Sequence, residues 1–246
     1  MKAAVIRFHG SNCDQDCVLA LSELGVPTDY VWHKDTSLAG YDLVVLPGGF
    51  SYGDYLRCGA IARFSPIMKA VKEYAASGKL LMGICNGFQI LCEAGLLPGA
   101  LIRNRSLHFV CQHQNVRVED IANPFLHLCR TGAALRIPIA HGEGSYTADA
   151  ATIRDLERQG RILLRYVDGG GASVDSANPN GSIDGIAGIV NEGRNVFGLM
   201  PHPERACDPR LGSSDGRIIF ESILASLGAI SMDEGAAAPT TSRSLT

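Results

Sequence analysis

The most constraining feature of this sequence is a cysteine between two glycines, placed where a strand-like run gives way to a helical pattern. The apolar run at residues 80–84 ends at Cys85, and residues 86–94 then carry apolar side chains at helical spacing. Gly83 and Gly87 complete Gly-x-Cys-x-Gly, the thiol counterpart of the nucleophile elbow Gly-x-Ser-x-Gly. Side chains at the flanking positions would collide with neighbouring backbone, so glycine fits there. The pattern predicts a strand–turn–helix unit with Cys85 at its apex.

The predicted turn gives Cys85 the environment of a reactive thiol. At a helix N-terminus, unpaired amide groups and the helix dipole favour a negative charge, and the thiolate is the nucleophilic form of cysteine. The alternative is that Cys85 is small apolar filler, because cysteine is among the most frequently buried residue types. The remaining chain must decide between these interpretations.

Strands and helices alternate along the first part of the chain. Such alternation, with almost continuous apolar strands, predicts an α/β fold whose mostly parallel sheet is covered by helices on both faces. Later segments add antiparallel strands, and Ser11 or Asn12 could cap the first helix. The expected strands are 2–8, 30–32, 41–46, 80–84, 109–119, 135–140, 161–167, 186–190 and 195–199, and the expected helices are 12–24, 66–76, 86–94, 149–159 and 213–227.

Length, charge and cysteine usage exclude several classes of protein. The 246 residues fit one domain, expected at 1–230, followed by a flexible C-terminal tail at 231–246. A net charge of -3 without a basic run argues against nucleic acid, and no apolar segment predicts a signal peptide or a membrane span. Eight cysteines without a Cys-x-x-Cys pair predict free thiols in a reducing cytoplasm and no thiolate zinc site.

A nucleophilic cysteine needs a base, and the base needs a group that orients it. His202 lies in Met-Pro-His-Pro-Glu, where the prolines favour an extended backbone. Residues two apart then project to the same side, so Glu204 can hold the imidazole of His202 while its other nitrogen faces Cys85. The alternative is a proline-rich turn with a surface glutamate. A metal site built from both His-x-Glu pairs, His141 with Glu143 and His202 with Glu204, is not favoured, and we expect no metal.

Gly48 and Gly49 follow an expected strand and should share the sheet edge with Cys85. They could form an ordinary turn. They could also supply an oxyanion hole, in which a main-chain amide at Gly49 and the amide of Asn86 stabilise the charge on an attacked carbonyl. The chain contains neither Gly-x-x-x-x-Gly-Lys-Ser/Thr nor Gly-x-Gly-x-x-Gly after its first strand, so it shows no nucleotide-phosphate motif.

These motifs together resemble those of the triad-type (class I) glutamine amidotransferases, and within them the glutaminase subunits of phosphoribosylformylglycinamidine synthase. The resemblance runs from about residue 3 to 227, and the long segment 47–60 is specific to these subunits among such enzymes. His9 departs from the proline usual there. Supporting segments are 83–91, Gly10-Ser11-Asn12-Cys13-Asp14, Arg103-Asn104, 137–144 and 198–205.

The resemblance implies a flavodoxin-like three-layer sandwich and a glutaminase of purine biosynthesis. It implies that Cys85 attacks the side-chain amide of L-glutamine, that His202 and Glu204 complete the triad, and that ammonia passes to a separate synthetase subunit. That large subunit would use ATP and Mg²⁺, while this chain needs no cofactor, and a small third subunit would bridge the two. The implied glutamine-binding residues are Gly48, Gln89, Asn104, Ser106 and Phe109.

Two further hypotheses stay open on the sequence alone. The chain could be a cysteine-elbow hydrolase or stress protein of the same layout, although such proteins lack the extended Pro-His-Pro-Glu segment after the last strand. It could also be a binding subunit whose triad is vestigial. Activity on peptides or aldehydes would favour the former, and failure of a glutamine-analogue electrophile to label Cys85 would favour the latter.

Overall fold

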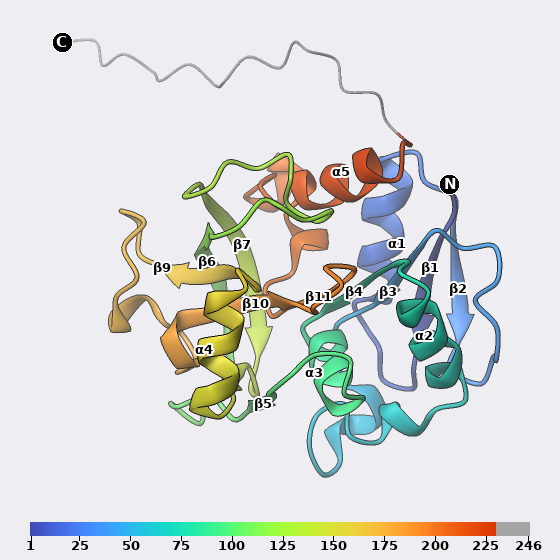
Figure 1. The fold of residues 1–246 in the computed structure, drawn as a ribbon, viewed down its shortest axis with the longest axis horizontal. Helices are drawn as coiled ribbons and strands as arrows, with labels where there is room; N and C mark the ends of the chain where they lie inside the picture. Colours follow the sequence, from blue (N-terminus) through green and yellow to red (C-terminus); the bar gives the residue numbers. More distant parts are fainter. Residues whose placement is uncertain (230–246) are drawn as a thin grey trace.

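The protein is described from a computed structural model, which places residues 1–229 (Figure 1). The tail expected at 231–246 lies outside these described residues. Within them, nine strands form one sheet in the order β2-β1-β3-β4-β11-β10-β9-β6-β7. These strands are β1 (Ala3–Arg7), β2 (Thr28–Trp32), β3 (Leu43–Leu46), β4 (Leu80–Ile84), β6 (Val110–Val118), β7 (Ala134–His141), β9 (Ile162–Val167), β10 (Ile186–Val190) and β11 (Val196–Leu199).

The sheet changes character at β11. Every pairing from β2 to β11 is parallel, and every pairing from β11 to β7 is antiparallel. Strands β3, β4, β10 and β11 are buried along their whole length, which explains their unbroken apolar sequences. The expected mostly parallel sheet with added antiparallel strands is confirmed.

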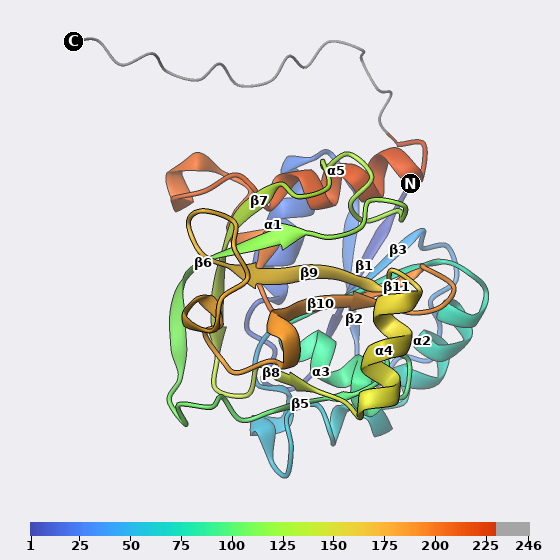
Figure 2. The same ribbon diagram turned by 60° about the vertical axis from the view of Figure 1, so that its left-hand side comes forward.

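Helices cover both faces of the sheet, which gives the three layers expected from the sequence. Figure 2 shows α1 and α5 on one face and α2 and α3 on the other. The helices are α1 (Asp14–Glu23), α2 (Ile67–Ala76), α3 (Asn86–Glu93), α4 (Ala150–Arg158) and α5 (Arg217–Ser226). Short 3-10 turns are η1 (Ser51–Asp54), η2 (Ala62–Phe64), η3 (Asp175–Ala177), η4 (Ile183–Gly185), η5 (Pro203–Arg205) and η6 (Pro209–Leu211).

Two local expectations were wrong or incomplete. Cys13, rather than Ser11 or Asn12, occupies the N-cap of α1, and no side chain caps that helix. A second, two-stranded antiparallel sheet of β5 (Ala100–Ile102) and β8 (Ser145–Thr147) was not anticipated, because three-residue strands are too short to show a period. None of the helices within residues 1–229 combines the length and apolar character needed to cross a bilayer.

The register of the sheet brings three chain segments to one edge. Ile84 of β4 pairs with Leu199 of β11, and Gly83 pairs with Leu46 of β3. Because these strands are parallel neighbours, the residues that follow them emerge side by side. The glycine loop after β3, Cys85 after β4 and the His202 segment after β11 therefore meet at the carboxyl edge of the sheet.

Candidate active site

Cys85 stands at the apex of the predicted turn, between β4 and α3. Its φ of 49° and ψ of -104° are unusual for a residue with a side chain, and they mark a strained backbone. The close packing predicted for the flanking glycines is present, since a Cβ on Gly87 would lie 1.9 Å from the carbonyl oxygen of Leu46. The Cys85 amide donates to the Leu199 carbonyl at 2.8 Å, and its Sγ lies 3.7 Å from the Ala140 carbonyl oxygen. The turn thus holds the thiol at the N-terminus of α3.

His202 and Glu204 form the predicted pair. The distance from His202 Nδ1 to Glu204 Oε1 is 2.6 Å, and both side chains are buried. The His202 backbone amide donates to the Pro138 carbonyl at 2.8 Å, which ties this segment to β7. The Nε2 atom of His202 has no hydrogen-bond partner within the described residues, so this nitrogen remains available to exchange a proton.

The structure brings Cys85 next to this pair. Burial disfavours the imidazolium, but the negative charges of Glu204 and Cys85 outweigh that effect and hold the pKa of His202 well above its ordinary value. Cys85, His202 and Glu204, the three residues predicted from the sequence to act together, therefore lie close to one another.

The glycine loop after β3, which contains Gly48 and Gly49, lies against His202. A Cβ on Gly48 would lie 2.7 Å from Cε1 of His202, so the loop packs directly on the imidazole ring. Gly49 has φ = 137°, and a Cβ there would lie 2.8 Å from the backbone nitrogen of Asn12. Only glycine both lacks a Cβ and readily adopts a positive φ, which explains the Gly-Gly pair at this point in the sequence.

Asn86 and Gln89 join this loop to α3. The Asn86 side chain accepts from the Ser51 amide at 3.2 Å and donates to Gln89 Oε1 at 2.8 Å. Gln89 Nε2 in turn donates to the Glu143 carbonyl at 2.6 Å. Both polar ends of Gln89, expected to contact glutamine, are thus engaged inside the protein, where they tie the loop after Gly49 to the loop after β7.

Asn104, also expected in the glutamine pocket, is completely buried. Its side chain donates to the carbonyls of His108 and His141 at 2.9 and 2.8 Å, and its Oδ1 accepts from the Gly144 amide at 2.9 Å. Burial and the nearby His202 charge lower the pKa of His141 to about 4, so this ring is neutral. Asn104 therefore anchors the loop that leads to Ser106 and Phe109.

Ser106 and Phe109 lie on the surface. Ser106 is exposed and accepts from the His108 amide at 3.3 Å. Phe109 is 53% exposed, and its ring centroid lies 6.3 Å from that of Phe50, the residue after the Gly48-Gly49 pair. Ser106 therefore lies on the protein surface, and Phe109 adjoins the glycine loop.

Sequence reasoning missed Cys13 and Arg205. Arg205 donates to the Cys13 sulfur at 3.0 Å and to Asp16 at 2.9 Å. Cys13 belongs to the segment 10–14 noted above. The residues around it give no sign that its side chain, at the N-cap of α1, lies near His202. The position of Arg205 directly after Glu204 was the one available signal.

One group of side chains within residues 1–229 has the spacing of metal ligands. Cys13, His202 and Glu204 each offer a ligand atom, and these atoms lie within 4.8 Å of one another. Thiolate, imidazole and carboxylate are zinc donors. A metal ion would have to displace the Arg205 guanidinium from the sulfur and the hydrogen bond between His202 and Glu204, so the residues present do not form a ready site.

Comparisons with known proteins agree over nearly the whole chain. The CobB/CobQ-like glutamine amidotransferase domain matches residues 1–214. The chain is 59% identical over 225 residues to phosphoribosylformylglycinamidine synthase subunit PurQ of Moorella thermoacetica, covering 91% of this chain and 95% of the relative. The subunit of the same name from Gloeobacter violaceus is 55% identical over 231 residues, covering 94% and 100%.

Solved structures show the same fold. A chain in the structure of PurLQS from Thermotoga maritima has a TM-score of 0.83 and 46% identity, covering 92% of this chain and 98% of that one. A glutamine amidotransferase from the same organism has a TM-score of 0.58 at 18% identity, covering 92% and 97%. The second likeness concerns the fold alone.

Proposed function

Because this chain belongs to the CobB/CobQ-like glutamine amidotransferase family, we propose that it is the glutaminase subunit of phosphoribosylformylglycinamidine synthase in purine biosynthesis. The observation that carries the proposal is the strained Cys85 beside the buried pair of His202 and Glu204. The names of relatives at 52–59% identity support the pathway and the partner. The proposed glutaminase unit spans residues 1–230.

The proposed chemistry starts with the Cys85 thiolate, which attacks the side-chain carbonyl carbon of L-glutamine. The oxyanion that forms accepts hydrogen bonds from the backbone amides of Gly49 and Asn86. Protonated His202 donates its proton to the departing nitrogen as the C–N bond breaks, which releases ammonia and leaves a γ-glutamyl thioester on Cys85. His202, held by Glu204, then takes a proton from the water that hydrolyses the thioester, and L-glutamate leaves.

The remaining candidate residues take different parts in this proposal. Gly48 packs on the His202 ring, and Ser106 and Phe109 border the glutamine site from its rim. Gln89 and Asn104 act through the loops that they hold, since their polar atoms are engaged within the protein. Glutamine would contact main-chain groups of those loops.

The ammonia would pass to a synthetase subunit, with a small third subunit in the complex, as the names of the relatives and of the PurLQS complex suggest. In this proposal the synthetase converts formylglycinamide ribonucleotide to the amidine and uses ATP and Mg²⁺, and this chain carries no cofactor. We further propose that the complex works in the cytoplasm, where a reducing environment suits the eight free cysteines of this chain. Activity should be low alone and rise when the synthetase and its nucleotide bind.

The test uses the assembled complex with Cys85→Ala and Cys85→Ser. Both variants should lose ammonia release from glutamine, while added ammonia should still support amidine formation, because the synthetase is intact. A glutamine-analogue electrophile should label Cys85 and nothing else on peptide mapping. Unchanged ammonia release in Cys85→Ala would rule out the mechanism, and absence of labelling in the complex would favour a vestigial triad.

A further inference from the structure

The segment at residues 10–16 has no part in the proposed chemistry, yet it touches two components of the site. Its first part runs along the glycine loop, with an antiparallel bridge between Ser11 and Gly49 and a hydrogen bond of 2.9 Å from the Phe50 amide to the Gly10 carbonyl. The Cys13 amide also approaches the Gly48 carbonyl at 3.4 Å. The proposed oxyanion loop is therefore held in place by backbone contacts with this segment.

The same segment reaches the histidine through side chains. Arg205 donates from Nε to Asp16 at 2.9 Å and from Nη2 to the Cys13 sulfur at 3.0 Å. Cys13 is 4% exposed, and its sulfur lies within 4.8 Å of a ring nitrogen of His202 and of a Glu204 carboxylate oxygen. Cys13 is thus the point where the oxyanion loop and the His202 segment meet.

The packing leaves the sulfur little freedom. A Cβ built on Gly48 would lie 3.1 Å from the Cys13 sulfur and 2.7 Å from the His202 ring, so the three groups share one confined space. A sulfur atom is large and polarizable, and it fills such a space while contacting both the guanidinium and the imidazole. An alanine would leave a gap beside the ring, and a serine hydroxyl would fill only part of it.

We propose that Cys13 is a positioning residue, whose sulfur, held by Arg205, fixes the His202 ring against the glycine loop so that the imidazole faces Cys85. This inference rests on the proposed glutaminase function. The charged and titratable groups around the ring are Glu204 and Arg205 on its own segment, Cys85 at the N-cap of α3, His141 of β7 and Cys13 at the N-cap of α1. Asp16 of α1 adds a negative charge through its ion pair with Arg205.

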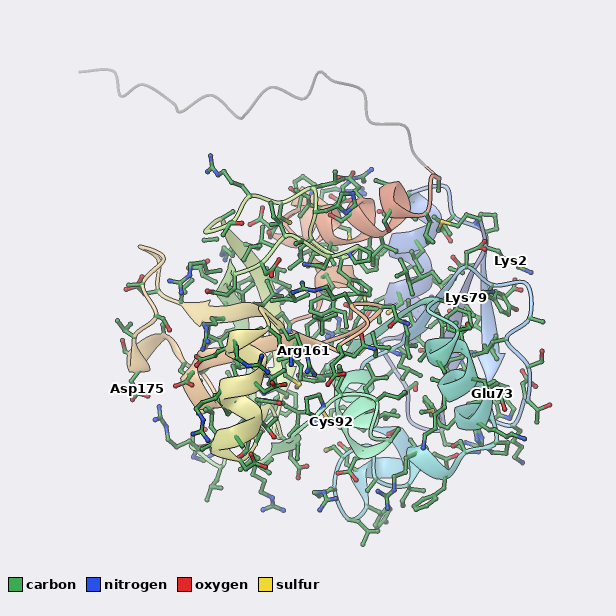
Figure 3. The ribbon with its side chains drawn as sticks, in the orientation of Figure 1. Lys2, Glu73, Lys79, Cys92, Arg161 and Asp175 are labelled. Atoms are coloured by element: carbon green, nitrogen blue, oxygen red, sulfur yellow. The ribbon has the colours of Figure 1, made fainter. Side chains whose placement is uncertain are left out.

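The test compares Cys13→Ala and Cys13→Ser with Cys92→Ala in the assembled complex. Cys92 lies on α3 (Figure 3), is also buried, and contacts the Pro98 carbonyl instead of the triad. For Cys13→Ala we expect kcat to fall about 10- to 100-fold, as for other small displacements of catalytic groups, with the KM for glutamine nearly unchanged. Cys13→Ser should lie between this variant and the unmodified protein, and Cys92→Ala should keep full kcat.

A pH profile separates positioning from mere packing. Cys13 is one of the groups that raise the pKa of His202, so its removal should move the basic limb of kcat/KM to lower pH. Combining Cys13→Ala with Arg205→Gln should cost less than the sum of the two single effects, because both act through one sulfur.

Three outcomes decide between positioning and its alternatives. An unchanged kcat and an unchanged pH profile in Cys13→Ala would overturn the inference, even if its melting temperature fell as much as that of Cys92→Ala. Should Cys13→Ala fail to fold, the kcat and pH profile of Cys13→Ser decide in the same way. Absence of glutaminase activity in the unmodified complex would instead refute the proposed function.

Discussion

His202 Nδ1 lies 2.6 Å from Glu204 Oε1, in a place that solvent does not reach. The hydrogen bond directs Nδ1 away from Cys85 and leaves Nε2 as the nitrogen that can exchange a proton with the thiol. In a buried place the carboxylate also offsets the cost of a positive charge on the ring. The orientation and the charge of the His202 ring therefore depend on the same contact.

Glu204→Gln should lower kcat on the order of 10²-fold or more, because an amide can neither stabilise the imidazolium nor enforce its tautomer as the carboxylate does. The pKa of His202 should fall, so the basic limb of the kcat/KM profile should move to lower pH. Glu192→Gln, at a side chain that is 80% exposed, is the matched control and should behave like the unmodified protein. Equal kcat in the two variants would remove Glu204 from the mechanism.

His141 should make folding sensitive to acid. Its pKa is lowered by burial and by the His202 charge to about 4, whereas the unfolded chain titrates near the ordinary value of about 6.5. Above a pH of about 6.5 the neutral ring makes its full contribution to the stability of the folded protein. This contribution is lost as the pH falls through about 4. It amounts to roughly 3 kcal/mol.

We expect His141→Gln to flatten the dependence of the free energy of unfolding on pH over this interval, as measured by urea denaturation. His108→Gln, at an exposed position, is the control and should retain the full slope. An undiminished slope in His141→Gln would show that other groups set the acid sensitivity.

Gly87→Ala should destabilise the protein by about 1–3 kcal/mol or abolish folding, because the added methyl would fall 1.9 Å from the Leu46 carbonyl oxygen in a region without free space. Gly169→Ala has no atom within 4 Å of the new methyl and should change the free energy of unfolding by less than about 0.5 kcal/mol. Thermal and urea denaturation of the two variants measure the difference. Equal stabilities would mean that the elbow can relax.

Leu56→Asp should weaken association with the synthetase by about tenfold or more, because exposed apolar groups beside a site are typical of partner surfaces. Leu56 is 89% and its neighbour Tyr55 75% exposed, on the loop that follows Gly49. Leu19→Asp on α1, at a side chain that is 53% exposed, is the control. Titration of the labelled subunit with the synthetase gives both affinities, and an unaltered affinity in Leu56→Asp would move the interface elsewhere.

The parts of the site that sequence reasoning located share a local cause. The turn at Cys85 is dictated by two glycines and an apolar strand, and the presentation of His202 is dictated by flanking prolines. The register of β4 and β11 was not readable, because pairing between distant strands is decided by the packing of the whole sheet. The residue types and the flanking prolines suggested His202 as the partner of Cys85, and the strand register shows how the two come together.

The parts of the site that the sequence could not describe depend on long-range contacts. The family resemblance implied Gln89 and Asn104 as glutamine-binding residues, and the structure adds that their side-chain amides donate to the carbonyls of Glu143 and of His141 at the end of β7. Cys13 could not be distinguished from seven other cysteines, because its distinguishing neighbour, Arg205, lies at the opposite end of the chain. These residues are distinguished by their burial and by their hydrogen-bond partners, and the sequence around each residue reveals neither.

The order of strands also bears on the synthesis of the protein. β11 inserts between β4 and β10 in the middle of the sheet, and among the described strands it is the last to be translated. A nascent chain that already displays Cys85 still lacks the central strand and the histidine that follows it. If His202 acts as proposed, a polypeptide that stops before β11 should form no productive triad and release no ammonia, so the topology ties glutamine hydrolysis to completion of the sheet.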